Sequence, residues 1–180
     1  MHRLFCFAAA VLLSAGIGHA STVVSVTPTP TTVTTGTNFT VNVDVLTDDS
    51  IFGYAFDITY PDTFLTLVGV TEGSSSGCCF DPGDSSTPGL ISQVFNLSAG
   101  GPFPSGTLFT LEFTATGLGT GQITAGNFSF SDDNFNTIEV SQSNPADVAS
   151  VPEPSTMLSL PLVGIWMWRR SRRQDRGILK

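Results

Sequence analysis

The residues best suited to bind an ion are three oxygen-bearing side chains at alternate positions. Asp132, Asn134 and Asn136 have the spacing of the first three ligands of a calcium-binding loop. Such a loop also needs glycine at its sixth position and glutamate at its twelfth, where this chain has Thr137 and Ser143. The pattern therefore predicts either a polar turn between strands or a weak calcium site, and we expect no other cofactor.

A second reactive feature is a pair of adjacent cysteines, Cys78 and Cys79. Three states are open to the pair: a disulfide between the two neighbours, a bridge to another chain, or two free thiols. Because exported proteins meet an oxidising environment, we expect a disulfide of one of the first two kinds.

Basic residues are missing from the centre of the chain. All seven Lys and Arg residues and both histidines lie outside residues 21–150. This segment therefore offers no imidazole base, lysine nucleophile or arginine clamp, and we predict that the protein is not an enzyme. Of the 15 acidic residues, all but Glu153 and Asp175 lie in the same segment. Phosphates would find no cation there, so nucleic acid is not expected as a partner.

The first twenty residues have the three parts of a secretory signal peptide. Arg3 precedes an apolar run over residues 4–17, and Ala20 closes the segment with a small side chain. We predict export and cleavage by signal peptidase after Ala20.

Residues 21–150 alternate between apolar and polar side chains, which is the pattern of half-buried strands. The clearest alternation covers residues 38–46, 51–60 and 107–116, and shorter patterns bring the number of strands to about nine. We predict an all-β domain in which two antiparallel sheets pack as a sandwich. Without ion pairs, apolar burial and backbone hydrogen bonds must hold it together. Pro28 and Pro30 favour an edge or lead-in segment.

Residues 151–180 combine a proline-rich motif, an apolar run and an arginine cluster. The motif consists of Val151, Pro152, Glu153, Pro154 and Ser155. The apolar run, residues 156–168, would span about 20 Å as a helix, against a hydrocarbon core of about 30 Å. The cluster that would hold this short C-terminal membrane helix from the cytoplasmic side consists of Arg169, Arg170, Arg172 and Arg173.

In this order, the three features resemble the PEP-CTERM sorting tail. The resemblance implies that residues 151–155 are a sorting signal read by a membrane-embedded, transpeptidase-like exosortase. It implies an intermediate anchored in the inner membrane, with the domain in the periplasm. The mature protein would then reach the cell surface or the extracellular matrix, in an organism that often makes exopolysaccharide and biofilm.

The central segment resembles a cohesin domain over nearly all of residues 34–141. The runs that carry the resemblance are residues 36–45, 51–73 and 106–140, with Tyr60, Pro61 and Asp62 as a characteristic part. It implies a jelly-roll sandwich of nine strands, related in fold to some carbohydrate-binding modules. Cohesins bind dockerin modules on one sheet face, and no residue of that face can be assigned by motif.

We therefore expect an exported, non-catalytic binding or adhesion module for polysaccharide or for another envelope protein. The alternative is a structural matrix protein that self-associates without a discrete ligand. The expected organisation is a signal peptide (1–20), a β-sandwich (21–150) and a sorting tail (151–180).

Overall fold

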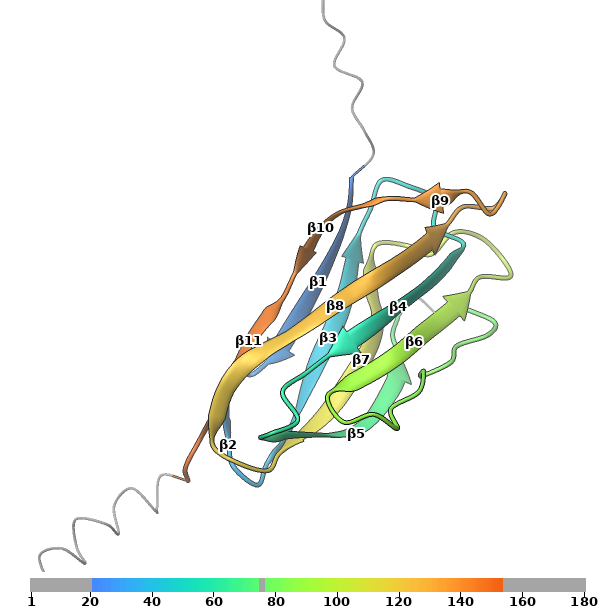
Figure 1. The fold of residues 1–180 in the computed structure, drawn as a ribbon. Coiled ribbons are helices and arrows are strands. Elements are labelled where there is room, and N and C mark those ends of the chain that lie inside the picture. The colour runs from blue at the N-terminus through green and yellow to red at the C-terminus, as the bar shows by residue number, and fades with distance from the viewer. Residues whose placement is uncertain (1–20, 75–76, 154–180) are drawn as a thin grey trace, which may run out of the picture.

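The computed structural model describes residues 21–74 and 77–153, which form two facing sheets (Figure 1). The five-stranded sheet contains, in spatial order, β10 (Val140–Asn144), β1 (Thr22–Thr29), β3 (Asn38–Leu46), β7 (Gly106–Ala115) and β5 (Leu65–Glu72). The six-stranded sheet contains β2 (Thr32–Thr34), β11 (Ala146–Val151), β8 (Gly119–Ser131), β4 (Gly53–Thr59) and β6 (Leu90–Leu97), and β9 (Thr137–Ile138) pairs with β8. The predicted two-sheet sandwich is confirmed.

The core is built from the apolar halves of the alternating strands. On β3, β4 and β7 the buried side chains are Phe39, Val41, Val43, Val45, Tyr54, Phe56, Ile58, Phe109, Leu111, Phe113 and Ala115. Phe56 and Phe109 join the two sheets, with ring centroids 5.4 Å apart. Each large buried side chain contributes about 1.5–3 kcal/mol. The buried apolar side chains of the described residues form one cluster, so residues 21–153 hold a complete core.

The first and last strands add two parallel ladders to the predicted antiparallel arrangement. β1 pairs with β10, and β2 pairs with β11, in both cases in the same direction. The chain changes sheet between β1 and β2, and again between β10 and β11 at Pro145. The blue and orange strands of Figure 1 therefore cross from one sheet to the other together and close one side of the sandwich.

Two further details concern strand boundaries. β8 is one continuous strand of 13 residues. Pro28 lies in β1, but β10 pairs only with residues 22–25 of that strand. Pro28 therefore has β3 on one side and no ladder neighbour on the other, which is where a residue without N–H is tolerated.

The segment before β6 runs along the free edge of that strand. The backbones of Asp81 and Phe95 exchange two hydrogen bonds, of 2.9 and 3.1 Å. Gly77 lies so close to the strand that an added Cβ would meet Asn96 Oδ1 at 2.2 Å. Phe80 packs on the core, with its ring centroid 6.4 Å from that of Phe109. These contacts fix the segment against the sheet.

Within the described residues, no helix has the length and apolar character needed to span a membrane. The predicted signal peptide, the apolar run of residues 156–168 and the arginine cluster lie outside the described residues.

Candidate binding surfaces

Asp57 lies on the outer face of the six-stranded sheet, on β4, which runs between β6 and β8. Its Oδ1 accepts a hydrogen bond from the backbone N–H of Gln93 on β6 (2.8 Å), and its Oδ2 accepts one from Asn127 Nδ2 on β8 (2.6 Å). Gln93 and Asn127 have φ angles of 56° and 52°, and each lies where the ladder with β4 shifts register. Asp57 therefore holds a bulge on each neighbouring strand. The Asn127 amide and then the Gln93 N–H hold the pKa of Asp57 below its usual value.

Around Asp57, the outer face of β4, β6 and β8 carries short, mostly neutral side chains. Ala55 faces Phe95 on one side and Ser129 on the other, and Thr59 hydrogen-bonds Thr124. The exposed polar residues nearest to Asp57 include Thr59, Gln93, Asn127 and Ser129, and two more, Thr120 and Gln122, lie toward the other end of β8. Apart from Phe95 beside Ala55, the centre of this surface, which we call the β4 face, carries short side chains that leave room for a partner.

On the outer face of the five-stranded sheet, more of the polar side chains bond to one another than on the β4 face, where the pairs Asp57–Asn127 and Thr59–Thr124 do so. Four hydrogen bonds join neighbours on β3 and β7: Asn38 with Glu112 (3.0 Å), Thr114 with Asn38 (2.7 Å), Thr110 with Asn42 (3.0 Å) and Thr107 with Asp44 (2.6 Å). A partner on this face would have to compete with bonds that are already made, so the β4 face is the better candidate.

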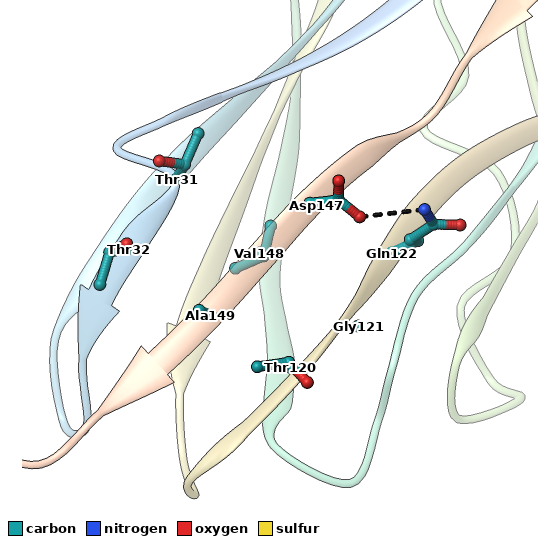
Figure 2. Close-up of a pocket in the computed structure, with 8 residues that line it drawn as sticks. All are labelled: Thr31, Thr32, Thr120, Gly121, Gln122, Asp147, Val148 and Ala149. Carbon is teal, nitrogen blue, oxygen red and sulfur yellow. Dashed lines mark hydrogen bonds between the residues drawn. The ribbon is translucent and has the colours of Figure 1, made fainter.

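An open hollow of about 450 Å³ lies where β2, β11 and β8 meet (Figure 2). Its lining consists of Thr31, Thr32, Thr120, Gly121, Gln122, Asp147, Val148 and Ala149. Gln122 Nε2 donates to Asp147 Oδ1 at 2.9 Å. The lining offers hydroxyl, amide and carboxylate groups but no aromatic ring. A sugar bound here would be held by hydrogen bonds alone, without a stacking platform.

The predicted calcium ligands form the turn between β8 and β9. Asp132 Oδ1 accepts the backbone N–H groups of Asn134 (2.9 Å) and Asn136 (2.8 Å), and Oδ2 accepts Asn136 Nδ2 (2.8 Å). The bonds from Asn136 and Asn134 lower the pKa of Asp132. The three residues thus come together as a polar turn, one of the two alternatives. The described residues contain no group of three or more His, Cys, Asp or Glu placed to hold a metal. The calcium site itself stays a prediction.

A smaller, partly apolar hollow of about 180 Å³ lies between this turn and β6. Its lining includes Phe52, Leu97 and Phe135, together with Asp132 and Asp133. Phe135 is 84% exposed, the most exposed of the large apolar side chains in the described residues. An apolar group with a positive charge beside it would complement this end of the sheet.

The two cysteines are exposed free thiols in the structure. A hydrogen bond with Cys78 is the main cause of the raised pKa of Cys79. The predicted disulfide remains a prediction.

The sorting motif is described only as far as Glu153. Val151 is the last residue of β11, and its carbonyl accepts the N–H of Thr35 at 2.9 Å. Pro154 and Ser155 lie outside the described residues.

A buried polar link between the sheets has no signal in the sequence. Asn96 is fully buried, and its Nδ2 donates to Glu72 Oε1 at 2.8 Å. Its Oδ1 accepts the N–H groups of Leu97 (2.9 Å) and Cys79 (3.4 Å). Asn96 therefore ties the end of β5 and the segment before β6 to the edge of the six-stranded sheet.

Two packed sheets with an open polar face define a β-sandwich binding module. The sequence profile of the cohesin domain matches residues 24–146, more than half of the chain, and the chain belongs to the cohesin domain family. Cohesin domains are non-catalytic binding modules, which confirms the prediction that the protein is not an enzyme.

Three solved structures illustrate the shared fold. A non-cellulosomal cohesin from the archaeon Archaeoglobus fulgidus has a TM-score of 0.63 at 18% identity, covering 77% of this chain and 97% of its own. A cohesin module from a family 33 glycoside hydrolase of Clostridium perfringens has a TM-score of 0.62 at 12% identity, with coverages of 74% and 98%. A type I cohesin–dockerin complex from Clostridium thermocellum has a TM-score of 0.60 at 15% identity, with coverages of 73% and 99%. Among curated proteins, none matches the chain.

Proposed function

We propose that this chain is an exported surface module that binds a protein partner, and that a dockerin-bearing protein is the partner class to test first. The observation that carries the proposal is the cohesin match over residues 24–146. The solved complex of a similar cohesin with a dockerin supports the choice of partner. The β4 face, with Asp57 at its centre, is the surface we assign to the partner.

Export and sorting complete the proposal. Residues 1–20 direct the chain across the membrane, and the tail of residues 151–180 presents residues 151–155 to an exosortase-type enzyme. The position of Val151, the last residue of β11, limits the distance between the sandwich and the membrane before processing. Four residues separate it from the apolar run, and four extended residues reach about 14 Å. Before processing, the sandwich would therefore stand close to the outer surface of the inner membrane.

The choice of a protein over a polysaccharide rests on the aromatic residues. Both tryptophans lie in the tail, at Trp166 and Trp168. Tyr54 is buried and Tyr60 packs against the core, so neither offers a free ring to a sugar. The ring of Phe135 is 84% exposed, but it lies beside Asp132 and Asp133 and does not line the hollow of Figure 2. The hollow of Figure 2 has the hydrogen-bonding groups for a sugar but no ring. Polysaccharide is therefore the rival ligand in the test.

The test compares one variant on each sheet face. Ser129→Arg places a long cationic side chain on the β4 face, and Thr110→Arg places the same side chain on the five-stranded face. Binding of each to a dockerin-bearing protein and to the exopolysaccharide of the producing organism is measured by calorimetry. The proposal predicts saturable protein binding that Ser129→Arg abolishes and Thr110→Arg retains.

Saturable binding of polysaccharide without protein binding would overturn the proposal. Repeating the titration with calcium and with a chelator examines the Asp132 turn at the same time. A loss of binding with chelator would support the predicted calcium site.

A further inference from the structure

The adjacent thiols have no partner in the exported chain other than each other. The third cysteine, Cys6, lies in the segment predicted to be removed. Both Cys78 and Cys79 are exposed, although the backbone that carries them is fixed. Any disulfide in the mature protein must therefore join the two neighbours or leave the chain.

The backbone around the pair is held at both ends. Gly77 N donates to Glu72 Oε1 at 2.7 Å, and Cys78 N donates to the Leu97 carbonyl at 2.8 Å. Cys79 N donates to Asn96 Oδ1 at 3.4 Å, and Phe80 is anchored on the core. The two thiols thus project from a platform that contacts β6, beside a hollow of about 440 Å³ lined by residues 98–104 together with Gly77 and Cys78.

A disulfide between Cys78 and Cys79 does not fit the backbone conformation of this segment. The peptide between them is trans, because the one cis bond among the described residues precedes Pro30. Consecutive Cα atoms across a trans peptide are about 3.8 Å apart, whereas disulfides usually join Cα atoms about 4.4–6.8 Å apart. Closing the small ring would require rotation of a peptide whose flanking N–H groups are both engaged.

We propose that Cys78 and Cys79 form a covalent contact between two copies of this chain, joined by two interchain disulfides. A second copy is the partner that is certain to present a matching pair of exposed thiols. In a two-fold symmetric contact the same patch meets itself, so each pair lies opposite the other. Two bonds hold the copies together better than one, because when one disulfide is reduced the other keeps its two sulfurs close enough to re-form it.

The oxidant is a small disulfide such as oxidised glutathione, in the oxidising environment outside the cytoplasm. A protein thiolate attacks this disulfide and releases one glutathione, leaving a mixed disulfide. A thiolate of the second chain attacks the protein sulfur and releases the second glutathione. Two interchain bonds consume four protein thiols and two molecules of oxidised glutathione, and four molecules of reduced glutathione are formed.

The experiment uses the full chain with Cys6→Ser, in mild detergent, treated with oxidised glutathione at several protein concentrations. Denaturing gels without reductant and intact mass spectrometry report the product. We expect a dimer four hydrogens lighter than two reduced chains, which dithiothreitol returns to monomer. The matched control carries Cys78→Ser and Cys79→Ser together and should stay monomeric with an unchanged circular dichroism spectrum and melting temperature.

The single variants Cys78→Ser and Cys79→Ser test the need for two bonds. Each should give a dimer two hydrogens lighter than two chains, which reverts at a dithiothreitol concentration roughly tenfold lower, because a second bond makes re-closure intramolecular. Equal resistance in wild type and single variants would overturn the two-bond arrangement.

Three other outcomes would overturn the proposal: a monomer two hydrogens lighter, free thiols after oxidation, or a dimer that persists in the double-serine control. The double variant can still be tested for partner binding, so failure of the covalent dimer is distinguishable from failure of the proposed function.

Discussion

Replacing Asn96 by alanine should strongly destabilise the domain, because it removes a buried polar link between the sheets. The side chain is fully buried and donates to the Glu72 carboxylate at 2.8 Å. A hydrogen bond to a charged group contributes about 1.5–3 kcal/mol. The change also removes the acceptor for the N–H groups of Leu97 and Cys79 and leaves a small cavity. We expect a total loss of about 2–4 kcal/mol in the free energy of unfolding.

The measurement is urea unfolding of residues 21–153, followed by far-ultraviolet circular dichroism. With a slope of about 2 kcal/mol per molar urea, the midpoint should fall by about 1–2 M while the slope is unchanged. The matched control is Glu72→Gln, whose amide oxygen can still accept from Asn96 and from Gly77. We expect this control to lose less than about 1 kcal/mol.

A loss of stability in Asn96→Ala no larger than that in Glu72→Gln would refute this reasoning. That result would mean that water replaces the amide without cost and that the link between the sheets is not a stabilising contact.

Three further predictions use the same unfolding assay. Phe109→Ala should cost about 3–5 kcal/mol and Phe135→Ala less than about 0.5, because the first ring is fully buried and the second is 84% exposed. Gly119→Ala should cost about 1–3 kcal/mol, since its Cβ would meet the Phe64 ring at 2.5 Å; equal midpoints for variant and wild type would contradict the overpacking. Asp57→Asn should be destabilising at pH 7, because an amide cannot accept hydrogen bonds at both ends. The folded-state pKa of Asp57 is depressed, so its contribution is present above about pH 4 and is lost as the pH falls through the folded-state pKa. The urea midpoints of this variant and wild type should converge in acid, and a constant difference would contradict the assignment.

The sandwich could be predicted from the sequence because several of its strands, β3 and β7 above all, alternate clearly between apolar and polar side chains. Phe39 to Val45 on β3 and Phe109 to Ala115 on β7 place every second side chain in the core, as their pattern indicates. Period-two patterning specifies which face is buried, and several such strands need a second sheet to cover them.

The bulges could not be predicted, because a bulge breaks the period on which the prediction depends. On β6, Ile91 is buried, but beyond Gln93 the buried positions shift to Val94 and Asn96. A strict alternation starting from Ile91 would have buried Gln93 and Phe95 and left Val94 and Asn96 on the outer face. The partner strands that compensate for the shift lie far away in the sequence, so the brace around Asp57 and the buried amide become visible only in three dimensions.

The two parallel ladders, β1 with β10 and β2 with β11, could not be predicted for a related reason. β2 has three residues and β11 has six, with little apolar alternation to identify them. The two ladders form because the first and last strands of the domain lie side by side where each changes from one sheet to the other. This arrangement depends on the whole fold.

The central claim is that the β4 face binds a protein. The most direct measurement is an NMR titration of the isotope-labelled domain with a dockerin-bearing protein from the producing organism. We predict that the perturbed amides cluster on β4, β6 and β8, around Ala55, Thr59 and Ser129, while those of Thr40 and Thr110 stay unchanged. Perturbations on the five-stranded face, or a response to polysaccharide and none to protein, would contradict it.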